Sequence, residues 1–157
     1  MIDLGSARGA TLSEVLVALT ILPIGLMGAM GAFQTSQRTI MQGTLSSQAL
    51  ALVESRIEAK RAARWEQLLS DDLNHDGLPD VIMRDDGQGG DRSGNDGTYT
   101  GRYDHGNISL TWSIQPLGAT NLRMAGLVVI EAQAVYGTEQ REVAMATVRA
   151  NPWYVGP

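Results

Sequence analysis

The sequence predicts an α+β fold in which one long N-terminal helix packs on a small antiparallel β-sheet. Residues 15–33 are apolar throughout, except for Thr20. Residues 41–57 carry apolar side chains at steps of three and four, which is the period of an amphipathic helix. Residues 108–115 alternate apolar and polar side chains, which is the period of a half-buried strand.

Length and composition limit the classes of protein that need to be considered. A chain of 157 residues allows one modest domain in addition to an apolar segment. The absence of cysteine excludes disulfides and thiol chemistry, so an exported domain would need another stabilising element, such as a metal ion. The net charge of −5 argues against nucleic acid as the main partner. Residues 71–106 hold nine aspartates and three arginines, a local charge of −6.

The apolar segment has the dimensions of a membrane-spanning helix. Residues 15–33 would extend about 28 Å as a helix, close to the ~30 Å hydrocarbon thickness of a bilayer. Glu14 lies at the edge of this run, where a carboxylate without a partner costs about 2–3 kcal/mol. Pro23 lies inside the run and predicts a kink. Three glycines form a stripe of small residues that would let helices approach closely: Gly25, Gly28 and Gly31.

Residues 9–19, with the sequence GATLSEVLVAL, resemble the class III signal of type IV pilins and pseudopilins. The resemblance implies that prepilin peptidase cuts between Gly9 and Ala10, and that the new amino terminus of Ala10 is methylated. It also implies that Glu14, the fifth residue of the mature chain, acts in assembly. Its buried carboxylate would be offset by the α-amino group of a neighbouring subunit. Ala10 departs from the family pattern, which usually has phenylalanine at this position.

The resemblance implies a domain plan and a location. Residues 1–9 would be a leader peptide, residues 10–33 a hydrophobic stem, and residues 34–157 the globular head of a pilin fold. The chain would cross the bacterial inner membrane once and then join other pilin or pseudopilin subunits in a periplasmic or cell-surface filament. Residues 24–28 are similar to the corresponding segment of PilV-type minor pilins. The I-type minor pseudopilin of type II secretion shares the pattern and stays an alternative.

Two further alternatives concern the amino terminus. A secretory signal peptide cut at Ala29-Met30-Gly31 would release a calcium-stabilised binding module that starts at Ala32. A plain membrane anchor would leave Glu14 without a purpose. We expect no enzyme, because no Ser-His-Asp signature, phosphate loop or dinucleotide fingerprint occurs in the sequence.

The head is predicted to contain a helix, a loop and a sheet. We expect one helix from about Thr11 to Leu69, capped by Thr11 or Ser13, whose head part covers residues 34–69. Its charged residues, among them Arg56 and Lys60, are expected on the polar side. The Asp/Gly-rich residues 71–106 are expected to be loop and residues 107–150 a sheet. The expected strands are 108–115, ended by Pro116, and 127–136 and 139–149, joined by a hairpin at Gly137 and Thr138.

Residues 72–80 (DLNHDGLPD) space oxygen ligands at alternate positions, and Gly77 falls where a metal-binding loop needs a sharp turn. Hard oxygen ligands suit Ca²⁺ and not zinc. The stretch resembles the calcium loops of dockerin and thrombospondin-type repeats. Met83 stands where an EF-hand has glutamate, so either Asp85 or Asp86 would complete the site or the site would be weak. The expected ligands are the side chains of Asp72, Asn74, Asp76 and Asp80 and the carbonyl oxygen of Leu78.

Three features of residues 72–105 carry weaker expectations. An ordinary Asx-rich turn is the alternative to the calcium loop. Residues 89–97 resemble a single calcium-binding β-roll repeat, and because such repeats need stacked neighbours we expect a flexible loop that is open to partners. His75 and His105 lack the companions of a zinc site, so we expect both to be solvated.

Overall fold

The computed structural model describes residues 11–119 and 121–154. The chain divides into two compact units, residues 1–41 and residues 42–157, and the first helix contributes to both. The elements are, in order, α1 (Leu12–Ala62), the 3₁₀ helix η1 (Trp65–Gln67), β1 (Ser70–Asp71), β2 (Val81–Ile82), β3 (Tyr99–His105), β4 (Ile108–Leu117), the 3₁₀ helix η2 (Leu122–Met124), β5 (Leu127–Tyr136) and β6 (Arg141–Ala150).

The first unit contains the apolar part of α1. Its best 18-residue window has a mean hydropathy of 2.1, and none of that window is buried. The helix runs without interruption through Pro23. It is therefore long and apolar enough to cross a membrane, which confirms this part of the prediction.

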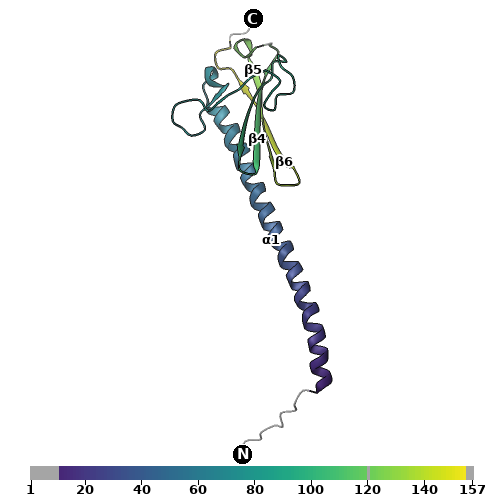
Figure 1. Ribbon diagram of the computed structural model, residues 1–157. Helices are drawn as coiled ribbons and strands as arrows, with labels where there is room; N and C mark the ends of the chain where they lie inside the picture. The colour runs from purple at the N-terminus through teal and green to yellow at the C-terminus, as the bar shows by residue number, and fades with distance from the viewer. Residues whose placement is uncertain (1–10, 120, 155–157) are drawn as a thin grey trace, which may run out of the picture. The chain divides into compact units, whose positions relative to one another are not determined.

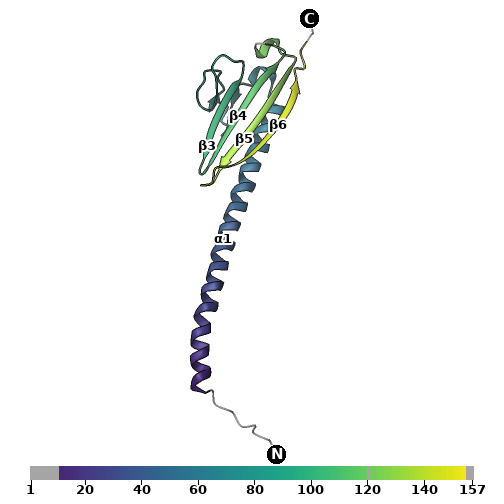
Figure 2. The same ribbon diagram turned by 90° about the vertical axis from the view of Figure 1, so that its right-hand side faces the viewer.

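In the second unit, β3, β4, β5 and β6 form one antiparallel sheet in that order, and Figure 2 shows the four strands side by side. β1 and β2 pair separately as a short two-stranded sheet. The strict alternation of buried and less buried residues along β4 and β5 gives the large sheet one face toward the core and one toward solvent.

The last four turns of α1 cover the core face of the sheet (Figure 1). Tyr136 Oη lies 3.1 Å from Ser46 Oγ and links the end of β5 to the helix. The confirmed fold is therefore α+β, with a long N-terminal helix on a small antiparallel sheet. The core includes Ala49, Val53 and Ile57 of α1, Leu110, Trp112 and Ile114 of β4, and Val128, Ile130, Ala132 and Ala134 of β5.

The helix is shorter than predicted, because it ends at Ala62 and not at Leu69. Neither glycine nor proline marks this end. Instead, the guanidinium of Arg149 on β6 donates to the carbonyl oxygens of Lys60 and Ala63, which are among the carbonyls that a helix end leaves unpaired. The chain then turns so that Trp65 is buried, and its indole N–H donates to Leu122 O at 3.2 Å.

The predicted loop at residues 71–106 contains strands, so this boundary was wrong. β3 pairs along its whole length with β4, from Tyr99 opposite Ile114 to His105 opposite Ile108. β4 continues through Pro116, which the sequence placed at the strand end. The pairing of β3 with β4 ends at Ile114, and beyond this residue β4 pairs with β5 alone. Pro116, which has no backbone N–H, therefore lies in the part of β4 that has a partner on one side only.

Residues 85–97 form a loop in which aspartate side chains bind the backbone. Asp85 accepts hydrogen bonds from the backbone N–H groups of Asp96 (3.1 Å) and Gly97 (2.9 Å). Asp91 accepts one from Gly87 at 2.7 Å and is 9% exposed. These aspartates therefore stabilise the loop by capping its backbone N–H groups.

Candidate functional site

Three of the described regions can carry function: the start of α1, the Asp-rich loop at residues 72–80 and the ion cluster beside that loop. The predicted cut between Gly9 and Ala10 lies outside the described residues. Glu14 is described, and it lies in the first turn of α1.

Thr11 and Glu14 form a reciprocal cap at the start of α1. The backbone N–H of Thr11 donates to Glu14 Oε2 at 2.9 Å, and the backbone N–H of Glu14 lies 3.4 Å from Thr11 Oγ1. This is the geometry of a capping box. Of the two caps that the sequence offered, the structure uses Thr11. The spacing Thr-x-x-Glu was the signal for this pair, and the capping box places the carboxylate against the backbone N–H of Thr11.

The Asp-rich loop folds around its own carboxylates. Asp72 accepts from the backbone N–H groups of Asp76 (3.2 Å) and Gly77 (2.8 Å), and Asp80 accepts from those of Leu73 (2.6 Å) and Asn74 (3.2 Å). Gly77 has φ +89°, a conformation that glycine adopts without strain.

The charge of Asp72 is stabilised by these donors. Partial desolvation alone would raise the pKa of Asp72, but the backbone N–H groups of Gly77, His75 and Asp76 outweigh it and hold this pKa below its ordinary value. The loop therefore favours an ionised carboxylate at the first of the five predicted ligand positions.

The amide of Asn74 lies between the other two predicted carboxylate ligands. Its Nδ2 donates to Asp76 Oδ2 at 3.1 Å and lies 3.5 Å from Asp80 Oδ1. Asp76 Oδ1 accepts the N–H of Leu78 at 2.8 Å. Within residues 11–119 and 121–154, no three His, Cys, Asp or Glu side chains converge as metal ligands. The oxygen donors suit Ca²⁺ in kind, and a bound cation would compete with the Asn74 amide for the Asp76 and Asp80 oxygens.

A buried ion cluster anchors the start of this loop. Asp71 Oδ1 lies 2.7 Å from Arg56 Nη1, and Asp71 Oδ2 lies 2.7 Å from Lys60 Nζ. Trp112 Nε1 donates to Asp71 Oδ2 at 3.0 Å, and the guanidinium of Arg56 lies 4.7 Å from the centroid of the Trp112 ring. Asp80 N donates to Asp71 O at 2.8 Å, so both ends of the loop are held at the cluster.

The sequence prediction placed Arg56 and Lys60 on the polar side of the helix, which was wrong. Lys60 is 1% exposed. Burial lowers the pKa of Lys60, and the Asp71 carboxylate opposes that shift. The signal was the spacing, because Lys60 follows Ala49, Val53 and Ile57 at helical steps on the buried side of α1.

Comparison with protein-family models, with curated proteins and with solved structures finds no match to this chain.

Proposed function

We propose that this chain is a minor pilin of a type IV pilus, cut by prepilin peptidase after Gly9 and methylated on Ala10. It crosses the bacterial inner membrane once, and it then joins or primes a helical filament of pilin subunits in the periplasm or at the cell surface. An I-type minor pseudopilin of type II secretion would use the same stem and is the nearest alternative.

The observation that carries this proposal is the exposure of the stem. Large apolar side chains of α1 are open to solvent on every side of the helix, including Leu16 (56%), Ile24 (71%) and Phe33 (62%). Exposed apolar area costs roughly 25 cal/mol per Å², so this segment needs a covering that the described chain does not supply. Lipid supplies it before assembly, and the stems of neighbouring subunits supply it afterwards. Gly25, Gly28 and Gly31 meet no atom within 4 Å on their side-chain side, which leaves room for a second helix.

The start of α1 suits the chemistry of assembly. Cleavage after Gly9 frees an α-amino group at Ala10, one residue before the Thr11 N–H that Glu14 already accepts at 2.9 Å. In an apolar surrounding the Glu14 carboxylate gains most from a cationic partner. A neighbour's amino terminus provides this partner when the subunit leaves the lipid. Contacts of this head-to-tail kind generate an open helical filament.

Three substitutions separate this role from helix capping. Glu14→Gln keeps a side-chain acceptor for the Thr11 N–H but removes the charge, Glu14→Ala removes both, and Thr11→Ala removes the hydroxyl half of the cap and keeps the carboxylate. We expect both Glu14 variants to be cut normally but to enter filaments about tenfold less or worse. We expect Thr11→Ala to enter filaments nearly as well as the parent chain, because losing this part of an exposed cap costs only about 1 kcal/mol.

The readouts are the amount of each variant in sheared filaments and the mass of its amino terminus. If Glu14→Gln assembles normally while Thr11→Ala does not, then Glu14 acts only as a cap and the assembly role is wrong.

We also propose that residues 72–80 bind Ca²⁺ and stabilise the head. Asp72, Asp76, Asp80, the amide oxygen of Asn74 and the carbonyl of Leu78 would hold the ion, whose charge would offset the local excess of carboxylates. The favoured ionisation of Asp72 and the tight turn at Gly77 support this. The ion cluster at Asp71 would hold the ends of the loop in place for binding.

A further inference from the structure

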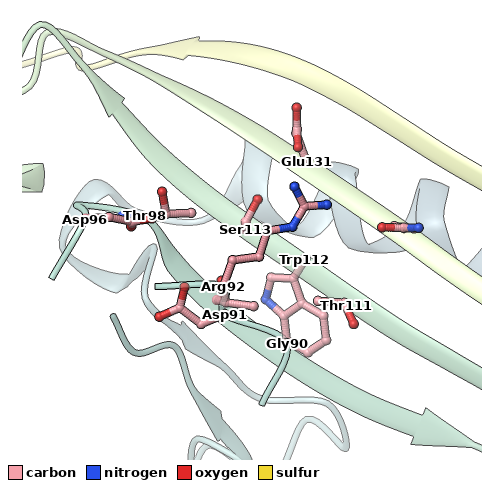
Figure 3. A pocket seen from close by; sticks show the side chains of 11 residues that line it. Gly90, Asp91, Arg92, Asp96, Thr98, Thr111, Trp112, Ser113 and Glu131 are labelled. Atoms are coloured by element: carbon pink, nitrogen blue, oxygen red, sulfur yellow. The ribbon is translucent and has the colours of Figure 1, made fainter. Parts of the chain in front are cut away.

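We propose that the head has a second, separate site that binds a neutral saccharide. The site is a cavity of about 330 Å³ between the loop at residues 90–98 and the solvent-facing side of the sheet (Figure 3). This volume falls within the roughly 300–1,000 Å³ of small-molecule pockets. The cavity shares no residue with the stem or the Asp-rich loop, so this proposal does not rest on the proposed filament function.

The floor of the cavity is a row of polar side chains across three strands. Thr100 of β3 lies opposite Ser113 of β4, and Ser113 lies opposite Glu131 of β5. Thr111 and Gln133, which are also paired, line the cavity beside this row. Because residues in register point to the same side of a sheet, the fold brings these five side chains onto one surface.

The wall of the cavity is the loop, which lies directly on the sheet. Gly90 has φ +106°, and a Cβ at this position would come within 3.0 Å of Thr111 Cγ2, so only glycine fits. Asp91 holds the loop through the N–H of Gly87. Figure 3 shows the Arg92 side chain extending from the loop along the cavity toward Ser113 and Glu131.

The lining carries hydrogen-bonding capacity that the protein does not use. Thr100 lines the cavity, and its hydroxyl has no protein hydrogen-bond partner among the described residues, while its oxygen stays open to solvent. Arg92 and Glu131 both line the cavity, and neither forms an ion pair with any described residue. A ligand in the cavity can therefore bond to the Thr100 hydroxyl without displacing a protein partner.

The mixture of groups points to the chemical class of the ligand. A purely cationic ligand would face Arg92, and a purely anionic one would face Asp96 and Glu131. A ligand with many hydroxyl groups can donate to the carboxylates and accept from the guanidinium. It can also do both with the side chains of Thr98, Thr100, Thr111 and Ser113. Because Trp112 is 1% exposed, recognition would rest on hydrogen bonds and not on stacking.

The test is a binding screen of the full chain in lipid nanodiscs, which avoids detergents with sugar headgroups. Saturation-transfer NMR and calorimetry would compare neutral mono- and disaccharides with uronic acids, free amino acids and dipeptides. We expect at least one neutral saccharide to bind. We expect its affinity to fall about 3- to 10-fold in Thr100→Val and about tenfold or more in Arg92→Gln.

Matched controls lie on the same sheet outside the cavity. Arg102→Gln changes the charge of β3 as Arg92→Gln changes that of the loop, and Thr147→Val repeats the threonine change on β6. Both should bind the saccharide as the parent chain does. Failure of every neutral saccharide, preference for amino acids or charged sugars, or equal losses in the control variants would each overturn the proposal.

Discussion

Lys60 Nζ and Asp71 Oδ2 lie 2.7 Å apart, with side chains that are 1% and 4% exposed. Their ion pair joins the last turn of α1 to β1, which precedes the Asp-rich loop. Arg56 holds the other carboxylate oxygen, so one carboxylate compensates two cations. Removing one member of such a buried group leaves charges without compensation, which costs far more than the intact pair contributes.

Asp71→Asn tests this relationship. The substitution keeps the size of the side chain but leaves Lys60 and Arg56 without their counter-charge. We expect the free energy of unfolding to fall by about 3–5 kcal/mol in urea denaturation. Glu58→Gln is the control, because it breaks the exposed pair with Arg61 and should cost at most about 0.5 kcal/mol. An equal fall in the free energy of unfolding of the two variants would show that the buried ion pair matters no more to stability than the exposed one.

Protonation of the Asp72 carboxylate should lower the stability of the head in acid. The pKa of Asp72 in the folded chain lies below its ordinary value of 3.8, so the unfolded chain binds protons first as the pH falls. The contribution of Asp72 is therefore fully present above about pH 3.8 and is lost as the pH falls through its folded pKa. Unfolding measured from neutral pH to about pH 2, with a chelator present, should show a flatter acid dependence in Asp72→Asn. An unchanged slope would contradict the hydrogen bonds that Asp72 accepts.

Calcium should raise the thermal stability of the head. A ligand that binds only the folded chain stabilises it by about 2.7 kcal/mol at 100 times its Kd. We expect a higher Tm in millimolar Ca²⁺ than in chelator, and no such rise in Asp76→Asn. Asp96 is in the neighbouring loop and accepts the N–H of Thr98, so the Asp96→Asn variant should keep the calcium response. The same Tm with and without Ca²⁺ would leave residues 72–80 as an Asx-rich turn.

The sequence was sufficient to predict the elements whose pattern is local. The long helix, the strand at 108–115 and the hairpin strands follow from apolar periodicity, and β5 matches its predicted range of 127–136. β3 could not be predicted in this way, because Tyr99–His105 contains Gly101 and Asp104 and lies in an Asp/Gly-rich stretch. It becomes a strand through its pairing with β4, which starts directly after the two-residue turn at Gly106 and Asn107. Such a turn is a hairpin signal that the sequence prediction missed.

Two further features of the head, the burial of Lys60 and the end of α1, were not predicted because the residues that bind there lie outside the helix. Lys60 is charged, and only its helical spacing from Ile57 indicates burial; the carboxylate that compensates it is eleven residues away, beyond the end of the helix. The end of α1 at Ala62 is bound by Arg149, which is 86 residues from the Ala63 carbonyl that accepts its hydrogen bond. For the candidate site, the sequence predicted roles for Glu14 and the loop carboxylates, but it did not predict the placement of the Asn74 amide between Asp76 and Asp80.

The proposed pairing of Glu14 requires an amino group that cleavage after Gly9 creates. Mass spectrometry of the mature chain, isolated from cells that produce the filament, measures this most directly. We expect a mature chain that begins at Ala10 and carries one methyl group on its α-amino nitrogen. A chain that retains residues 1–9, or one that begins at Ala32, would contradict it.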